Sequence, residues 1–202
     1  MTRRTTKGSE TRQEILAAAT DLFHKQGVGR TSPDQIIEAS GTGKGQFYHY
    51  FKNKEDLVHE VLQVYLETIR NGGGPIRYDI ASWDDLEQWF RAQLALQKRF
   101  HMTRGCPFGT IGNEVTESDE LIRQDLSLIF EVVKAKIAAF FVREKAAGRL
   151  DPDVSEERLA DFCIAMIQGA MLMGKVKRSS QLVESVVRET MTHVKRYVRE
   201  AP

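Results

Sequence analysis

Hydrophobic residues recur three and four positions apart along most of the chain, which is the spacing of amphipathic helices. Strand-like alternation, internal repeats and low-complexity segments are absent, and only 5 of the 202 residues are proline. Glycines, prolines and capping residues divide the pattern into segments. The sequence therefore predicts an all-α chain, with helices at about 9–27, 33–39, 43–50, 54–70, 82–101, 107–115, 119–147, 155–177 and 180–199.

The second and third of these segments form a helix-turn-helix pattern. Ser32 and Pro33 supply an N-cap and a first helical residue, and Gly41 ends the first helix after two turns. In the second helix Phe47 and Phe51 share one face with Tyr50. Polar side chains are left on or beside the other face, as a helix that enters the DNA major groove requires; they are Lys44, Gln46, Tyr48 and His49.

The residues from Thr31 to Gly41, together with Lys44–Gly45 and Phe47–Leu57, resemble the DNA-binding domain of TetR-family regulators. The resemblance implies a three-helix DNA-binding domain at 1–54 and a helical ligand-binding and dimerisation domain at 55–202. It also implies a homodimeric regulator, a repressor, that a small-molecule inducer releases from its operator. The departures are Thr42, Gly43 and Gln46, which stand where the family usually has valine, serine and a small hydroxyl residue.

Carried onto this chain, the resemblance assigns Lys44 and Gln46 to base edges. The residues assigned to phosphates are Thr31, Tyr48, His49 and Lys54, and Lys44 could contact both. The full expected DNA-binding set is Thr31, Ser32, Lys44, Gly45, Gln46, Tyr48, His49 and Lys54. Tyr48 could instead be a core residue. The basic arm at 2–8 is either a disordered terminus or a DNA contact. A phosphate-cradling glycine loop at 41–45 is disfavoured, because the preceding strand and the third glycine of a dinucleotide fingerprint are missing.

Charge and composition fit a DNA-binding head on a different body. Residues 1–54 carry 9 Lys or Arg and 5 Asp or Glu, a net charge of +4, whereas the remainder carries 20 and 23, a net charge of −3. No apolar signal segment begins the chain, and the longest uncharged apolar run, 162–173, is too short to span a membrane. We therefore expect a cytoplasmic protein with no membrane partner.

The second part of the chain supplies aromatic and methionine side chains suited to an apolar or aromatic effector. The expected ligand-binding residues are Trp89, Phe90, Phe108, Phe140, Met166 and Met173. Neither metal-ligand spacing nor a nucleophile motif is present, so we expect no metal and no cofactor. Glu114 and Glu117 are expected to be surface carboxylates rather than catalytic ones. The alternative function is an α-helical enzyme or small-molecule carrier with a vestigial DNA-binding head.

Helices 155–177 and 180–199 are more apolar than helices at a chain end need to be, and small residues such as Gly169 allow a close helix contact. They predict either packing within one subunit or, as in the family, a homodimeric four-helix bundle. Cys106 precedes Pro107 and resembles a sensor cysteine of one TetR branch, with Lys175 as its possible neighbour. The competing interpretation makes Cys106 a buried apolar residue, as we expect for Cys163.

Overall fold

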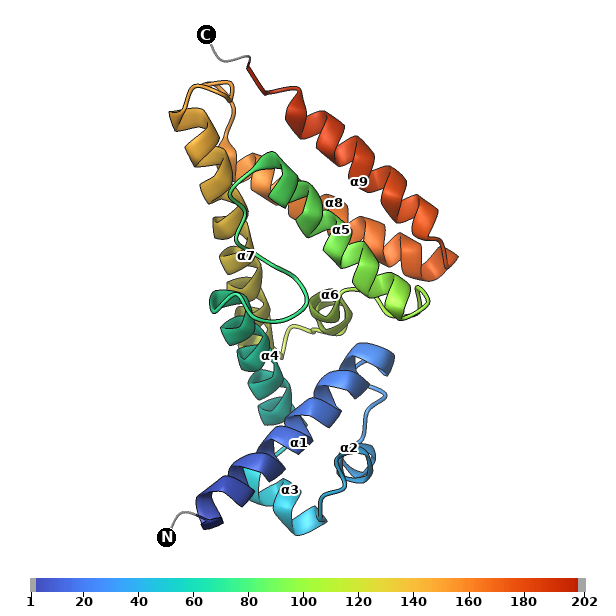
Figure 1. Ribbon diagram of the computed structural model, residues 1–202. Helices are drawn as coiled ribbons and strands as arrows, with labels where there is room; N and C mark the ends of the chain where they lie inside the picture. The colour runs from blue at the N-terminus through green and yellow to red at the C-terminus, as the bar shows by residue number, and fades with distance from the viewer. Residues whose placement is uncertain (1–2, 200–202) are drawn as a thin grey trace. The chain divides into compact units, whose positions relative to one another are not determined.

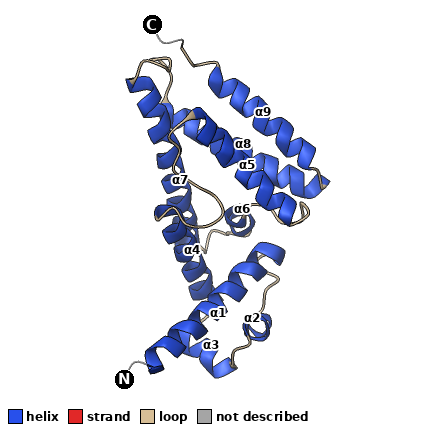
Figure 2. Ribbon diagram, viewed as in Figure 1, coloured by secondary structure: helices blue, strands red, loops and turns tan. Residues whose placement is uncertain are grey.

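The computed structural model describes residues 3–199, with the backbone alone for residues 3–7. This part of the chain confirms the all-α prediction, since it forms nine helices and no strand (Figures 1 and 2). The helices are α1 (Arg3–Gln26), α2 (Pro33–Ser40), α3 (Lys44–Tyr50), α4 (Lys54–Arg70), α5 (Trp83–Arg99), α6 (Pro107–Gly112), α7 (Glu120–Ala146), α8 (Glu156–Lys177) and α9 (Ser180–Lys195).

The first compact unit, unit 1, comprises Met1–Tyr65 and Pro107–Ser127. In it α1 contacts α2, α3 and α6, and α2 contacts α3. Its core is a set of fully buried apolar side chains that the helical spacing brings to one side of each helix: Ile15, Phe23, Ile36, Phe47, Phe51, Leu57 and Leu62. Unit 1 thus holds the helix-turn-helix and also α6, which is distant in sequence.

The second compact unit, unit 2, comprises Leu66–Cys106 and Leu128–Pro202. Here α8 and α9 pack closely on each other, and both contact α5. Its core includes an aromatic contact, in which the Trp83 ring meets the Phe140 ring edge-on at 5.1 Å between ring centroids. The division at residue 54 into a DNA-binding and an effector domain concerns function, and it stays a prediction.

Helix α1 begins earlier than the sequence indicated. It starts at Arg3, not at Ser9 or Thr11, so most of the predicted arm is helical. Gly8 does not break the helix, and it lies close to α3, since a Cβ at Gly8 would be 3.1 Å from the Tyr50 hydroxyl. The side chains of Arg3, Arg4 and Lys7 lie outside the described residues.

Two other helices end earlier than predicted. Helix α6 ends at Gly112 rather than Val115, because Glu114 N–H turns back to the Ile111 carbonyl in a tighter turn. Helix α9 ends at Lys195 rather than Arg199. Beyond it the chain pairs with the α7–α8 connection: Asp151 N–H donates to the Tyr197 carbonyl at 2.8 Å, and Arg199 N–H donates to the Arg149 carbonyl at 3.0 Å.

Candidate DNA-binding surface and effector region

The start of α2 is fixed by a reciprocal pair of hydrogen bonds. Gln35 N–H donates to Ser32 Oγ at 3.3 Å, and Ser32 N–H donates to Gln35 Oε1 at 2.9 Å. This is a capping box, with Pro33 at the first helical position. The helix ends at Gly41, whose φ of 65° is easily adopted only by glycine. The Ser32 hydroxyl is therefore held at the surface at the start of α2.

Helix α3 begins without a side-chain cap from its own N-cap residue, Gly43. Instead Gln46 reaches back, and its Oε1 accepts a hydrogen bond from Gly43 N–H at 2.8 Å. This leaves the Gln46 amide NH₂ group as a donor at the exposed surface. Sequence reasoning predicted Gln46 as a base-contacting residue, which stays a prediction, and missed this capping role, although Gln three positions after an N-cap is the known signal for it.

The two faces of α3 differ in burial as the helical spacing requires. Phe47 and Phe51 are buried in unit 1, whereas Lys44, Gly45, Gln46 and His49 are exposed. Tyr48 has 48% of its surface exposed, so it is not a core residue and the alternative interpretation is wrong. Lys44 Nζ lies 3.8 Å from the Asp34 carboxylate, and both side chains are well exposed. The outward face of α3 thus presents donors to solvent.

Thr31 and Lys54 converge on the turn that joins α1 to α2. The Thr31 hydroxyl donates to the Gly27 carbonyl at 2.6 Å, and Thr31 is 1% exposed. Lys54 Nζ donates to the Val28 carbonyl at 3.0 Å. Both residues hold the turn in this structure. Their contacts with phosphate stay predictions, and Thr31 lies beneath the surface rather than on it.

The six residues expected to bind an effector belong to both units and differ in burial. Trp89, Phe90 and Phe140 are buried in unit 2, Met166 is half-buried, and Met173 is exposed. Phe108 belongs to unit 1, where its ring meets Tyr65 edge-on at 5.1 Å between centroids. A ligand-binding role for any of the six stays a prediction.

Two buried polar atoms in unit 2 have no hydrogen-bond partner among the described residues: Trp89 Nε1 and Gln97 Oε1. Gln97 is 2% exposed, and its Nε2 donates to the Gly105 carbonyl at 2.7 Å. Because a buried polar atom without a partner is unfavourable, these two atoms are candidate contacts for an effector. Sequence reasoning missed Gln97. Its position as a polar residue on the apolar stripe of α5 is the pattern that could have indicated it.

Cys106 is buried at the end of the α5–α6 connection, and Gln168 Nε2 of α8 lies 3.3 Å from its Sγ. Lys175 is half-buried and follows Gln168 by two helical turns on the same side of α8. Gln168, which sequence reasoning missed, is therefore an α8 residue that reaches Cys106. Cys163 is buried in α8, and burial raises the pKa of its thiol to about 12, so it stays protonated near neutral pH.

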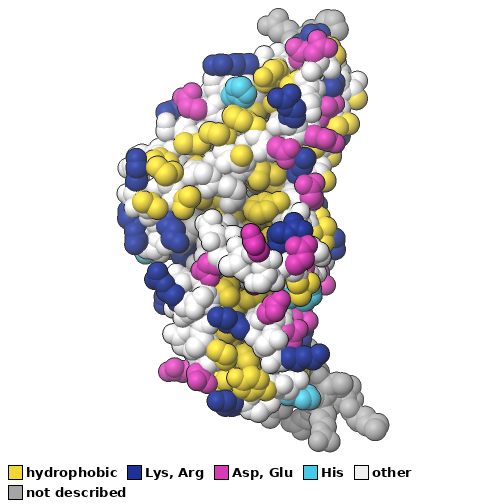
Figure 3. Space-filling view, turned by 180° about the vertical axis from the view of Figure 1, so that it is seen from behind, with side chains coloured by type: hydrophobic (Ala, Val, Ile, Leu, Met, Phe, Trp, Pro, Cys, Tyr) yellow, Lys and Arg dark blue, Asp and Glu magenta, His cyan; other side chains and the backbone are white. Residues whose placement is uncertain are grey.

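Helix α8 carries an exposed row of small and apolar residues spaced three and four apart: Ala165, Gly169, Leu172 and Val176. Leu172 and Val176 have 50% and 70% of their surface exposed. On the face drawn in Figure 3, hydrophobic side chains reach the surface between charged ones. Among the described residues α8 is the one helix long and apolar enough to cross a membrane, a test that core helices of soluble proteins also pass.

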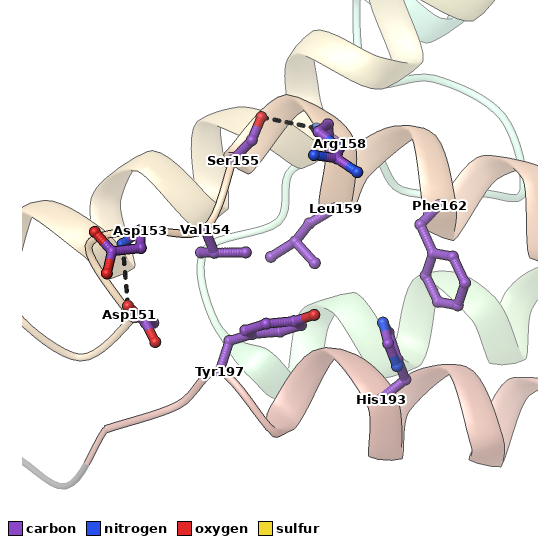
Figure 4. Close-up of a pocket in the computed structure, with 9 residues that line it drawn as sticks. All are labelled: Asp151, Asp153, Val154, Ser155, Arg158, Leu159, Phe162, His193 and Tyr197. Carbon is purple, nitrogen blue, oxygen red and sulfur yellow. Dashed lines mark hydrogen bonds between the residues drawn. The ribbon is translucent and has the colours of Figure 1, made fainter.

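A surface cavity of about 440 Å³ lies where the α7–α8 connection meets the start of α8 and the end of α9 (Figure 4). The Phe162 and His193 rings form one side, with centroids 4.6 Å apart, and Tyr197 lies beside His193. None of the six expected ligand residues lines this cavity. The described residues contain no group of His, Cys, Asp or Glu side chains that could hold a metal ion.

Comparison with known proteins agrees with this geometry. The family described as "Bacterial regulatory proteins, tetR family" matches residues 15–61, and "Tetracyclin repressor-like, C-terminal domain" matches residues 83–190. An HTH-type transcriptional regulator of Lactococcus lactis is 29% identical over 87% of this chain and 88% of its own. The transcriptional repressor DhaR of a Mycobacterium species is 26% identical over 84% and 85%. The crystal structure of a Rhodobacter sphaeroides TetR regulatory protein superposes with a TM-score of 0.80, at 24% identity, over 91% and 98%.

Proposed function

Because the chain belongs to the TetR family of bacterial regulatory proteins, we propose that it represses transcription by binding a pseudo-palindromic operator as a homodimer. The family makes it a DNA-binding transcriptional regulator and not an enzyme. The observation that carries the proposal is α3, which buries Phe47 and Phe51 and turns a polar face to solvent. Such a helix can enter the major groove and present donors to base edges.

Within this proposal the DNA-binding residues divide into two groups. Lys44 and Gln46 contact base edges. Gly45 between them has no side chain and faces open space, since a Cβ there would meet nothing within 4 Å, so the DNA can approach the backbone at this position. Phosphates are contacted by residues at the start of α2, on α3 and at the start of α4, namely Ser32, Tyr48, His49 and Lys54. Thr31, which is buried, supports them by holding the turn before α2.

The dimer is proposed to form through α8 and α9, whose exposed apolar residues a second copy would cover. A Cβ at Gly169 would meet nothing within 4 Å, so this position is open to a partner helix. Val187 of α9, in contrast, is 8% exposed and packs within its own subunit. A second copy that covers the apolar side of α8 would also explain why this helix exposes side chains such as Leu172 and Val176.

Release from the operator is proposed to follow binding of an apolar or aromatic small molecule in unit 2. The buried Trp89 Nε1 and Gln97 Oε1 atoms favour a ligand that also forms hydrogen bonds. Modification of Cys106 by an oxidant or electrophile is the second proposed route. The Gln168 amide lies at the Cys106 sulfur, which supports this route. Cys106 is also buried, which supports the competing interpretation that it is a buried apolar residue.

The test starts from operator DNA selected by the protein from random sequence. Gln46→Ala would confuse two effects, because it removes the acceptor for Gly43 N–H as well as a base contact. Gln46→Glu keeps an acceptor for Gly43 and replaces the amide donor with a carboxylate. We expect operator affinity to fall by about 1–3 kcal/mol and preference to move towards cytosine at one position, since carboxylates accept from cytosine N4.

The matched control is Gln93→Glu, which makes the same change on α5, outside the proposed DNA-binding and dimer surfaces. It should leave operator affinity and base preference unchanged in a gel-shift assay. If Gln46→Glu binds the selected operator as tightly as the wild type does, α3 does not contact the bases. If the wild-type protein selects no sequence at all, the proposed function itself is wrong.

A further inference from the structure

The turn that joins α1 to α2 is held by residues from outside the turn. Its four residues are Gly27 to Arg30, and it delivers the chain to Thr31 and Ser32 at the start of α2. Thr31 Oγ1 donates to the Gly27 carbonyl and Lys54 Nζ to the Val28 carbonyl. Three residues of the proposed DNA-binding set are therefore positioned through this one turn.

Glu114 makes the contact with this turn that is most distant in sequence. Gly29 N–H donates to Glu114 Oε2 at 2.7 Å, across 85 residues of sequence. The second carboxylate oxygen lies over Gly27, where an added Cβ would be only 1.9 Å from Glu114 Oε1. Gly27 has a φ of 87°, which favours glycine, and a Cβ added there would push the carboxylate away. The turn is thus shaped to receive Glu114.

Glu114 is attached to α6. Its own N–H donates to the Ile111 carbonyl at 3.0 Å, and the Ile111 side chain is buried in unit 1, where α6 contacts α1. The Glu114 residue itself is exposed, so water can replace its contact with Gly29. Beside the contact lies a cavity of about 230 Å³ whose lining includes Val28, Lys54, Ile111 and Glu114. The carboxylate therefore has both a rigid attachment and room to withdraw.

We propose that Glu114 is a positioning residue for operator binding, and that its attachment to α6 holds its carboxylate against Gly29. With the carboxylate on Gly29, the turn holds Thr31, Ser32 and Lys54 where DNA binding needs them. Without the Glu114 carboxylate, the turn loses its contact at Gly29 N–H and affinity falls. This inference rests on the proposed DNA-binding function and adds a residue that does not itself touch DNA.

The first experiment compares Glu114→Ala with Glu117→Ala, an exposed glutamate of the same connection. Each variant removes one negative charge near the DNA-binding unit, which by electrostatics alone would leave operator affinity equal or slightly higher. We expect Glu114→Ala to lower operator affinity about tenfold and Glu117→Ala to leave it unchanged. Glu114→Gln, which keeps an acceptor oxygen, should lie between Glu114→Ala and the wild type. Thermal unfolding midpoints of all three should stay close to that of the wild type.

The second experiment keeps the Glu114 carboxylate but detaches it from α6. Two glycines inserted between Gly112 and Asn113 keep Glu114 in the chain but release it from the helix. The insertion should lower operator affinity about as much as Glu114→Ala does. An insertion variant that binds operator like the wild type would show that α6 does not act through Glu114.

A third measurement does not depend on DNA. Amide hydrogen exchange at Gly29 should be faster in Glu114→Ala than in the wild type and unchanged in Glu117→Ala. Equal operator affinity and equal Gly29 exchange in the two alanine variants would overturn the inference and leave the proposed function intact. Failure of the wild type to bind any DNA would remove the proposed function, while faster exchange at Gly29 would still establish the contact.

Discussion

The outward faces of α3 and α8 are both exposed, yet they are built in opposite ways. Helix α3 presents Lys44, Gln46 and His49, and the Gln46 side chain also caps the helix. Helix α8 presents Leu172 and Val176, apolar groups that make no hydrogen bonds. A polar face over a satisfied backbone is stable in water and can exchange water for DNA. An apolar face of this length gains from being covered.

The two faces therefore have different dependence on conditions. Contacts of α3 with phosphates would weaken as salt rises, because bound counterions are released when DNA is bound. Contacts of α8 with a second copy would be insensitive to salt and dominated by apolar burial. A single chain could in this way bind DNA with α3 and a second copy with α8, because neither surface suits the partner of the other.

The largest effect is expected from placing a charge on the apolar face. Leu172→Glu puts a carboxylate in the centre of the exposed row of α8, where a dimer would have to bury it without a partner. We expect a monomer at micromolar concentration by analytical ultracentrifugation, and operator affinity at least a hundredfold lower, because one half-site is then bound alone.

Ala95→Glu is the matched control, since it adds the same charge at an exposed position of α5 in the same unit. It should leave the sedimentation coefficient and operator affinity unchanged. A wild-type protein that already sediments as a monomer would show that the apolar face of α8 is not covered by a second copy.

An intermediate effect is expected at Glu144, a buried carboxylate of unit 2. Arg149 Nη2 donates to its Oε1 at 2.6 Å and Trp83 Nε1 to its Oε2 at 2.9 Å, and the bond from Arg149 lowers the pKa of Glu144 below its ordinary value of 4.5. Hydrogen bonds to a charged group contribute about 1.5–3 kcal/mol. Glu144→Gln should therefore lower the free energy of unfolding by about that amount at pH 7, measured by urea denaturation.

The pH dependence of this loss has a definite sign. Because the folded-state pKa is lowered, ionised Glu144 contributes stability above pH 4.5, and the contribution is lost as pH falls through that value towards the folded pKa. The difference between wild type and Glu144→Gln should thus shrink on acidification. Glu120→Gln is the comparison: Arg123 and Gln124 lower the pKa of Glu120 to about 2, but this pair is exposed, and we expect no measurable change in the unfolding midpoint at pH 7.

The smallest effect is expected at the cap of α2. Ser32→Ala removes the oxygen that accepts from Gln35 N–H, which typically costs about 1 kcal/mol. We expect a thermal midpoint lowered by a few degrees. Ser127→Ala, at an exposed position within α7, should change the free energy of unfolding by less than about 0.5 kcal/mol. An equal loss in both variants would mean that the capping box contributes nothing.

Much of unit 1 could be predicted from the sequence because its structure depends on neighbouring residues. Ser32, Pro33 and Gly41 delimit α2 through contacts made within a few residues. The burial of Phe47 and Phe51 follows from helical spacing alone. The start of α1 was missed, since nothing local distinguishes a basic helical start from a basic arm.

The remaining features depend on residues that are distant in the sequence. The early end of α9 follows from pairing with residues 149–151, and the contact of Glu114 with Gly29 spans 85 residues. The sequence indicated Glu114 only as a surface carboxylate, because its contact depends on which turn lies opposite. For the same reason the sequence did not indicate Gln168, whose side chain contacts Cys106, and the proximity of Lys175 to Cys106 stays a prediction.

The capping contact of Gln46, together with its proposed contact with a base, has a consequence for how this regulator could change its target genes during evolution. A substitution at Gln46 that alters the preferred base also alters the start of α3, because the same side chain satisfies Gly43 N–H. Mutational routes to a new operator are therefore restricted to residues with an acceptor of similar reach, unless Gly43 first becomes a capping residue such as serine. The order in which the two positions mutate would then decide which regulatory targets the lineage can acquire.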